Sequence, residues 1–176
     1  MKPVEAETSD DVLAQFCAEH GQPLLRFAYL LTGGRAADAE DLVQSALAGL
    51  AARGLSGLDS PAAYVRRSII NEHRSAGRHA TVERRVHPRL VEPSPPVPTP
   101  EDRFAVLSAL DTLTERERAA VVLRYYEDLP DEQIAATLGC RRATVRSLIH
   151  RAMPKLRRLL DDGDGRSERS PDDDAV

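Results

Sequence analysis

A dense cluster of arginines near the C-terminal end of the sequence could bind nucleic acid. Between Cys140 and Arg158 the chain carries seven Arg and Lys residues and no Asp or Glu. Arginine neutralises phosphates and can donate two hydrogen bonds to a guanine edge, so a helix with an arginine-rich exposed face suits the DNA major groove. Charge runs of this kind more often cover a solvated helix face, and the arginines alone do not decide between the two interpretations.

The residues around these arginines have the spacing of a helix-turn-helix. Thr114 and Glu117 form a T-x-x-E capping box, which predicts a helix start. Counted from Asp131, the small Ala135 allows two helices to approach, and Gly139 suits a left-handed turn. The apolar face of this unit is predicted to consist of Ile134, Leu138, Val145 and Ile149. This combination favours DNA binding over a merely solvated face.

A second basic stripe lies earlier in the chain. Ser60 and Pro61 predict a helix start, with Ser as the N-cap and Pro at the first helical position. In the helix that follows, to about Arg78, Val65 and Ile69 are predicted to face inward. The outward stripe, spaced by four, three and four residues, consists of Arg67, Asn71, Arg74 and Arg78. Arg and Asn both read base edges, but a solvated face explains this stripe equally well.

A third candidate surface is acidic. A helix from Asp11 to about Leu31, interrupted near Gly21 and Pro23, is predicted to end at the glycine pair 33–34. The next helix opens with Asp38, Glu40 and Asp41, which favour a helix N-terminus through its dipole. Its buried stripe is predicted to consist of Leu42, Ala46, Leu47 and Leu50, with Asp38, Asp41 and Ser45 on an exposed face. The residues alone favour helix capping as the explanation of these acids.

The composition predicts an all-α protein made of two small helical domains. The 176 residues are 41% hydrophobic but only 4% aromatic, which suits small Leu, Val and Ala cores. Five prolines between Val91 and Pro100 predict an extended linker. We expect a first domain over 11–79, a flexible Pro-rich linker over 80–100, a second domain over 101–160 and a disordered acidic tail over 161–176. Phe104, Leu107 and Leu110 are predicted to face inward on the first helix of the second domain.

The formal net charge of −4 hides a segregation of charge, because residues 161–176 contain seven acidic side chains and two arginines. The sequence has no nucleophile elbow, phosphate loop or clustered metal ligands, so we expect no enzyme activity, no metal and no cofactor. Cys17 and Cys140 are far apart and are predicted to be reduced. Because neither a membrane-spanning run nor a signal-peptide pattern is evident, we predict a cytoplasmic protein without membrane insertion.

Taken together, these motifs resemble those of the extracytoplasmic-function sigma factors, the two-domain type of bacterial RNA polymerase specificity subunit. YLLTGGRAADAEDLVQSAL (29–47) and PAAYVRRSIINEHRSAGR (61–78) are similar to conserved region 2 of that family. LTERERAAVVLRYYEDLPDEQIAATLGCRRATVRSLIHRA (113–152) is similar to region 4. The resemblance implies a protein that binds core RNA polymerase and promoter DNA without catalysing a reaction. An anti-sigma factor is a further candidate partner.

The resemblance also implies functions for individual residues. Docking on the clamp helices of core polymerase falls to Asp38, Glu40, Asp41, Leu42 and Gln44. Contact with the promoter −10 element falls to Arg67, Asn71, Arg74 and Arg78. Contact with the −35 element falls to Arg141, Arg142, Thr144, Arg146, Ser147, His150 and Arg151.

The chain departs from the family pattern at several positions. It has no Trp, Pro130 and Arg141 stand where Ser is usual, and Leu148 stands where Arg or Lys is frequent. Asp131 can replace the helix cap lost at Pro130. Two alternative functions are a stand-alone helix-turn-helix regulator of the response-regulator type and a sigma-like decoy that binds an anti-sigma factor.

Overall fold

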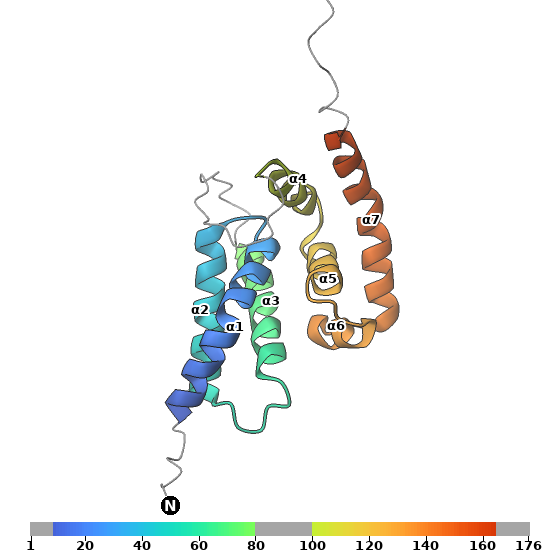
Figure 1. The fold of residues 1–176 in the computed structure, drawn as a ribbon. Coiled ribbons are helices and arrows are strands. Elements are labelled where there is room, and N and C mark those ends of the chain that lie inside the picture. Colours follow the sequence, from blue (N-terminus) through green and yellow to red (C-terminus); the bar gives the residue numbers. More distant parts are fainter. Residues whose placement is uncertain (1–8, 80–99, 165–176) are drawn as a thin grey trace, which may run out of the picture.

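The computed structural model describes residues 9–79 and 100–164, which form seven α-helices and no strand, and the predicted all-α class is confirmed. One group of helices comprises α1 (Ser9–Leu31), α2 (Ala36–Arg53) and α3 (Pro61–His79). A second group comprises α4 (Pro100–Asp111), α5 (Glu115–Tyr125), α6 (Asp131–Leu138) and α7 (Arg142–Asp164). The two groups lie side by side, with α2 and α7 at opposite edges (Figure 1). Within the described ranges, no helix has the length and apolar character needed to span a membrane.

The predicted linker lies outside the described residues except for Pro100, which begins α4. Most of the predicted acidic tail is also outside them. Its first four residues, 161–164, form the end of α7, so the helix runs further than the sequence pattern indicated.

The interruption predicted near Gly21 and Pro23 is wrong, because α1 is one continuous helix with Pro23 inside it. Proline removes one helical hydrogen bond and costs about 3 kcal/mol. Phe16 is buried before the proline, and Leu24 and Phe27 are buried after it. Each buried side chain of this size stabilises the fold by about 1.5–3 kcal/mol, so packing on both sides outweighs the local cost.

The end of α1 and the start of α3 lie where the sequence predicts them. The N–H of Gly34 donates to the Tyr29 carbonyl at 2.9 Å, so the glycine pair closes α1 as predicted. The Ser60 hydroxyl accepts from the N–H of Ala63 at 3.2 Å and caps α3. In α2 the buried stripe consists of Ala39, Val43, Ala46 and Leu50, while the predicted Leu42 and Leu47 are half-buried.

The helix-turn-helix forms as the sequence indicated. Thr114 and Glu117 make a complete capping box at α5. Gly139 adopts φ 60° and ψ 45°, the left-handed conformation that turns α6 into α7. The prediction that Phe104 faces inward is wrong, because Phe104 is 62% exposed, whereas Leu107 and Leu110 are buried as predicted. The buried core reaches only the C-terminal half of α4, so the apolar stripe runs past the part that other helices cover.

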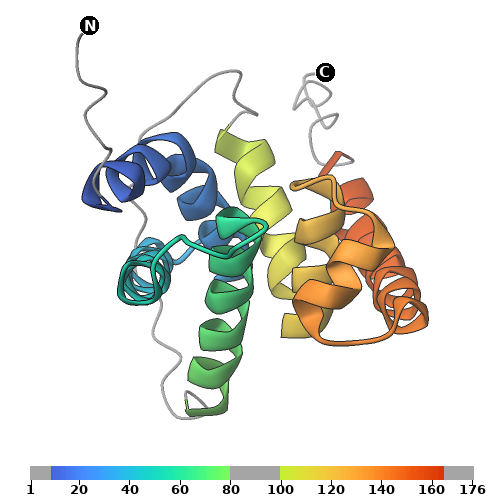
Figure 2. The same cartoon turned by 90° about the horizontal axis from the view of Figure 1, so that it is seen from below.

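The two helix groups pack through α1 against α5 and through α3 against α6 (Figure 2). The contact centres on Arg118 of α5, whose guanidinium is buried. It donates to the carbonyl of Leu110 at 2.9 Å, to the carboxylate of Asp111 at 3.0 Å, and across the interface to the carbonyl of Leu31 at 3.0 Å. Leu31 is the last residue of α1, and the last carbonyls of a helix accept no hydrogen bond within it. A buried charge and buried helix-end carbonyls therefore satisfy one another.

Gly33 makes room for this contact. A side chain at this position would place its Cβ 2.9 Å from an Asp111 carboxylate oxygen and 3.0 Å from Nη1 of Arg118. Its φ of +69° is also one that other residues rarely adopt. A second bridge joins Arg66 of α3 to Glu127, whose side chain is nearly buried, at 2.5 Å.

His73 of α3 is buried near the same interface, and its Nε2 has no hydrogen-bond partner. Burial lowers the pKa of the His73 imidazole, because the charged form loses its hydration. Among neighbouring charges, Glu115 and Asp38 raise this pKa, whereas Arg118 and Arg35 lower it. The net effect is a neutral histidine in the folded protein near pH 7.

We predict that Arg118→Met lowers the free energy of unfolding by about 2–4 kcal/mol, because the carbonyls of Leu31 and Leu110 lose charged hydrogen-bond donors. Methionine retains the apolar stem of the side chain. Urea unfolding followed by circular dichroism measures the change. Arg116→Met, at an exposed position of the same helix, is the control and is expected to change stability by less than about 0.5 kcal/mol.

We predict that acidification from pH 7.5 to 5.5 destabilises the protein partly through His73. The pKa of His73 is lower in the folded protein than in the unfolded chain, so the unfolded chain binds more protons in this range. Stability therefore decreases as the pH decreases. The fall should be smaller in His73→Leu, measured by urea unfolding at each pH. The exposed His150→Leu is the control and should keep the full dependence. Equal slopes in all three proteins would contradict the prediction.

Candidate nucleic-acid interface

The exposed face of α7 carries most of the residues predicted to contact the −35 element. Thr144 is half-buried, and the exposed members of the set are Arg141, Arg142, Arg146, Ser147, His150 and Arg151. The opposite face of the helix is pinned to the core by Val145, Leu148 and Ala152. Leu148 therefore does not occupy the exposed face, and its difference from the family pattern is a matter of packing. Ile149, predicted to be in the core, is half-buried.

Each of three exposed arginines on α7 has an acidic partner behind it. Arg142 pairs with Glu132 at 2.6 Å, and Arg146 pairs through Nε with Asp131 at 3.0 Å. Arg151 lies 3.6 Å from Glu117. Helical spacing does not reveal these partners, since they come from α5 and α6. The pairs restrict where the guanidinium groups point and reduce the net positive charge of the face.

Glu117 connects the start of α5 to α7. Its carboxylate accepts from the Thr114 backbone N–H at 3.1 Å and from Lys155 Nζ at 2.7 Å. Burial alone would raise the pKa of the Glu117 carboxyl, but the hydrogen bonds from Lys155 and Thr114 outweigh it and leave the pKa below its ordinary value. The carboxylate is therefore charged at neutral pH, and the capping residue also fixes the position of α7.

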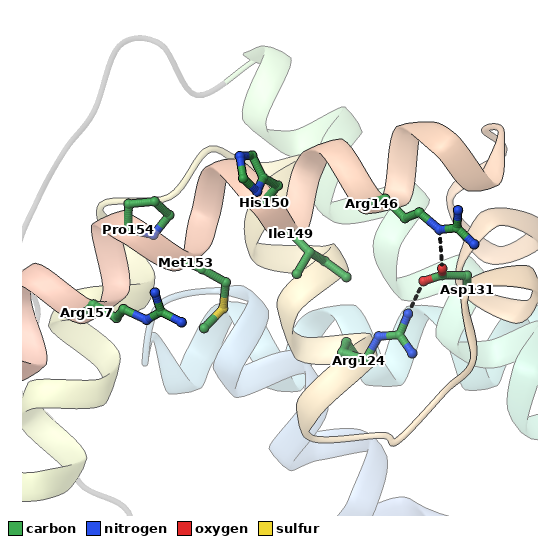
Figure 3. Close-up of a pocket in the computed structure, with 8 residues that line it drawn as sticks. All are labelled: Arg124, Asp131, Arg146, Ile149, His150, Met153, Pro154 and Arg157. Carbon is green, nitrogen blue, oxygen red and sulfur yellow. Dashed lines mark hydrogen bonds and ion pairs between the residues drawn. The ribbon is translucent and has the colours of Figure 1, made fainter.

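Asp131 does not cap α6, contrary to the sequence expectation. The N-cap is Pro130, without any side-chain hydrogen bond, and Asp131 is the first helical residue. Its carboxylate instead lies between Arg124 and Arg146 (Figure 3). A cavity of about 410 Å³ opens beside this trio. It is lined by Arg124, Asp131, Arg146, Ile149, His150, Met153, Pro154 and Arg157. With three arginines against one acid, this surface can receive an anionic group such as a phosphate.

The stripe on α3 is open to solvent over most of its length. Arg67 and Asn71 are exposed and Arg74 is half-buried. Arg78 belongs to the same helix, but its side chain is outside the described residues. Arg66 and His73 were not among the predicted site residues, and they face the second helix group. Their spacing of seven, with the apolar Ile69 and Ile70 between them, is an inward-facing helical pattern that could have identified them.

The acidic residues of α2 are open to solvent. Asp38, Glu40, Asp41 and Gln44 are exposed, and Leu42 is half-buried. Arg35 pairs with Asp38 three residues later. The helix dipole acts only within the first turn, which spans 36–39, so capping does not account for Glu40 and Asp41. An acidic surface with one apolar side chain suits a basic protein partner.

Comparison with known families decides what these three surfaces belong to. Residues 16–79 match the family model of sigma-70 region 2, and residues 109–158 match that of sigma-70 region 4. The chain belongs to the sigma-70 family. The resemblance inferred from the sequence motifs is confirmed, and the protein is an RNA polymerase sigma factor. Its individual site residues and domain limits stay predictions.

Relatives place this sigma factor in the extracytoplasmic-function group. It is 34% identical to the RNA polymerase sigma-E factor of Streptomyces antibioticus over 131 residues, covering 72% of this chain and 73% of that one. It is 35% identical to the ECF RNA polymerase sigma factor SigL of Mycobacterium tuberculosis over 151 residues, covering 81% of this chain and 85% of that one.

Solved structures share the fold of this sigma factor. The sigma factor RpoE of Bartonella quintana, in complex with the anti-sigma factor NepR, superposes with a TM-score of 0.71 at 24% identity and covers 85% of this chain and 97% of that one. CnrH, in complex with the cytosolic domain of CnrY, superposes with a TM-score of 0.62 at 24% identity and covers 87% of this chain and 90% of that one.

Proposed function

We propose that this sigma factor docks on core RNA polymerase through the outer face of α2 and directs it to promoters by placing α3 at the −10 element and α7 at the −35 element. The observation that carries the proposal is the separation of charge among three open helix faces. The face of α2 is acidic, whereas those of α3 and α7 are basic. The first suits a protein partner and the other two suit DNA.

The docking part of the proposal rests on how α2 is packed. Its apolar side is covered by α1 and α3, so its acids can only face outward. Leu42, half-buried at the edge of the packed side, offers apolar area beside the acids. Charged rims around apolar area are common in protein interfaces and increase the rate of association.

The DNA part rests on the residue types and their spacing. Arg67 and Asn71, four residues apart, are adjacent on one exposed face of α3. On α7, Arg146 and His150 have the same relation. Arg and Asn can contact phosphates and base edges, so both helices offer groups that can position the protein on the duplex and groups that can read the base sequence.

As a sigma factor of this kind, the protein works in the cytoplasm with the polymerase and catalyses no reaction itself. We also propose an anti-sigma factor as a partner, because both structural neighbours named above are held by one. The match of residues 16–79 to region 2 argues against a stand-alone regulator of the response-regulator type, because that interpretation assigns no function to this half of the chain. A decoy would need no DNA faces, and this protein has retained both.

In vitro transcription with core polymerase tests the proposal. Adding this protein to core enzyme and genomic DNA of its source should give transcripts from specific start sites. The absence of any specific transcript, with the protein folded and bound to core enzyme, would leave only the decoy interpretation.

We predict that Asp41→Lys weakens binding to core polymerase at least tenfold, which corresponds to about 1.4 kcal/mol, because it places a cation in an acidic docking face. Fluorescence anisotropy of the labelled protein with core enzyme measures the affinity. Glu19→Lys makes the same charge change on the exposed side of α1 and should leave the affinity within about twofold. Equal effects of the two substitutions would count against the α2 surface.

A further inference from the structure

The carboxylate of Asp131 is shared between two arginines in the helix-turn-helix. One oxygen accepts from Nη2 of Arg124 on α5, and the other accepts from Nε of Arg146 on α7 at 3.0 Å. Figure 3 shows the carboxylate between the two guanidinium groups. Asp131 thus joins α6 to the helix before it and the helix after it.

Stability of α6 alone does not explain this arrangement. The side chain of Asp131 forms no capping hydrogen bond, although the residue is the first of α6, a helix of only eight residues. Its two carboxylate oxygens both point to guanidinium groups instead. What it contributes therefore concerns the arginines.

The charges of the trio leave Arg146 available to a polyanion. One carboxylate against two guanidinium groups gives a net charge of +1. The side chain of Asp131 is 18% exposed, whereas that of Arg146 is 67% exposed, so the acid lies behind the cation. A duplex that approaches α7 meets the guanidinium first.

The geometry of the pair orders the guanidinium group of Arg146. Since Nε is held by Asp131, the two terminal Nη groups are free for a phosphate or a guanine edge. An arginine side chain that rotates freely loses rotamer entropy when it binds a ligand. Holding the side chain in advance reduces that loss.

The other two acid–arginine pairs on α7 lack this combination. Arg142 and Glu132 are 55% and 70% exposed, so solvent screens their interaction. Arg151 lies 3.6 Å from Glu117, beyond hydrogen-bonding distance. Of the three pairs, that of Asp131 and Arg146 has both a shielded carboxylate and a hydrogen bond.

We propose that Asp131 is a positioning residue for the −35 contact: it does not touch DNA, and it holds Arg146 in the orientation that binds the duplex. This inference rests on the proposed function of α7. The opposite possibility is that Asp131 competes with DNA for Arg146, in which case the acid weakens binding.

The two possibilities predict changes of opposite sign. Holoenzyme assembled from core polymerase and the full chain would first select its −35 element from a promoter library randomised in that region. Promoter affinity is then measured for wild type, Asp131→Ala, Arg146→Ala, the double variant and Glu132→Ala. Asp131→Ala should weaken binding about 5–20-fold, within the range of a lost bidentate contact. The control Glu132→Ala, which removes an acid of equal charge from an exposed pair, should change affinity by less than about twofold.

The double variant separates positioning from a general structural effect. In the Arg146→Ala background, removing Asp131 should cause no further loss, because there is no guanidinium left to hold. A loss confined to one base pair of the element supports the inference with a base edge as the ligand. A loss spread evenly over all sequences, with a weaker salt dependence, supports it with a phosphate as the ligand.

Three results would overturn the inference. The first is unchanged or tighter binding by Asp131→Ala, and the second is a loss that persists in full in the Arg146→Ala background. The third is a large fall in the thermal unfolding midpoint of Asp131→Ala, combined with normal folding and wild-type promoter affinity in Asp131→Asn, which keeps the shape of the side chain. If wild-type holoenzyme enriches no −35 sequence, the proposed function of α7 fails and the positioning of Arg146 fails with it. If wild-type holoenzyme enriches a −35 sequence but Asp131→Ala does not change promoter affinity, only the inference about Asp131 fails.

Discussion

The buried guanidinium of Arg118 is the constraint on which the arrangement of the helices depends. An arginine cannot lose its charge, so its burial requires acceptors on every side. It finds them at the ends of two helices, in the carbonyls of Leu110 and Leu31. The first belongs to its own helix group and the second to the other group. The absence of a side chain at Gly33 allows the close approach, so one residue of α5 holds the end of α1 against the second helix group.

The local features of the fold could be predicted from the sequence, and the long-range ones could not. The capping box at Thr114 and the turn at Gly139 depend on residues within one or two turns, and both formed as expected. Pro23 and Phe104 were misjudged because their outcome depends on what distant helices cover. Packing before and after Pro23 keeps α1 helical through a residue that disfavours helix, whereas Phe104 is left 62% exposed on α4.

The same division holds for the candidate interface. Helical spacing alone placed Arg67, Asn71 and the basic residues of α7 on open faces, because exposure follows from which residues of a helix are apolar. It could not show which acids stand behind the arginines. Those partners come from α5 and α6, at separations of 15 residues for Asp131 and Arg146 and 38 for Glu117 and Lys155. The recognition surface is therefore a mixed one, in which carboxylates determine the orientation of the cations.

The packing of α3 and α7 on opposite sides of α6 has a consequence for promoter geometry. Packed helix axes lie 8–10 Å apart, so two such contacts in series separate α3 from α7 by about 20 Å. Promoter elements at positions −10 and −35 are 25 base pairs apart, which is about 85 Å of B-DNA. If one molecule makes both proposed contacts, its two helix groups must therefore separate. That separation would break the bonds from Arg118 to Leu31 and from Arg66 to Glu127, and their free energy would offset part of what polymerase and DNA binding provide.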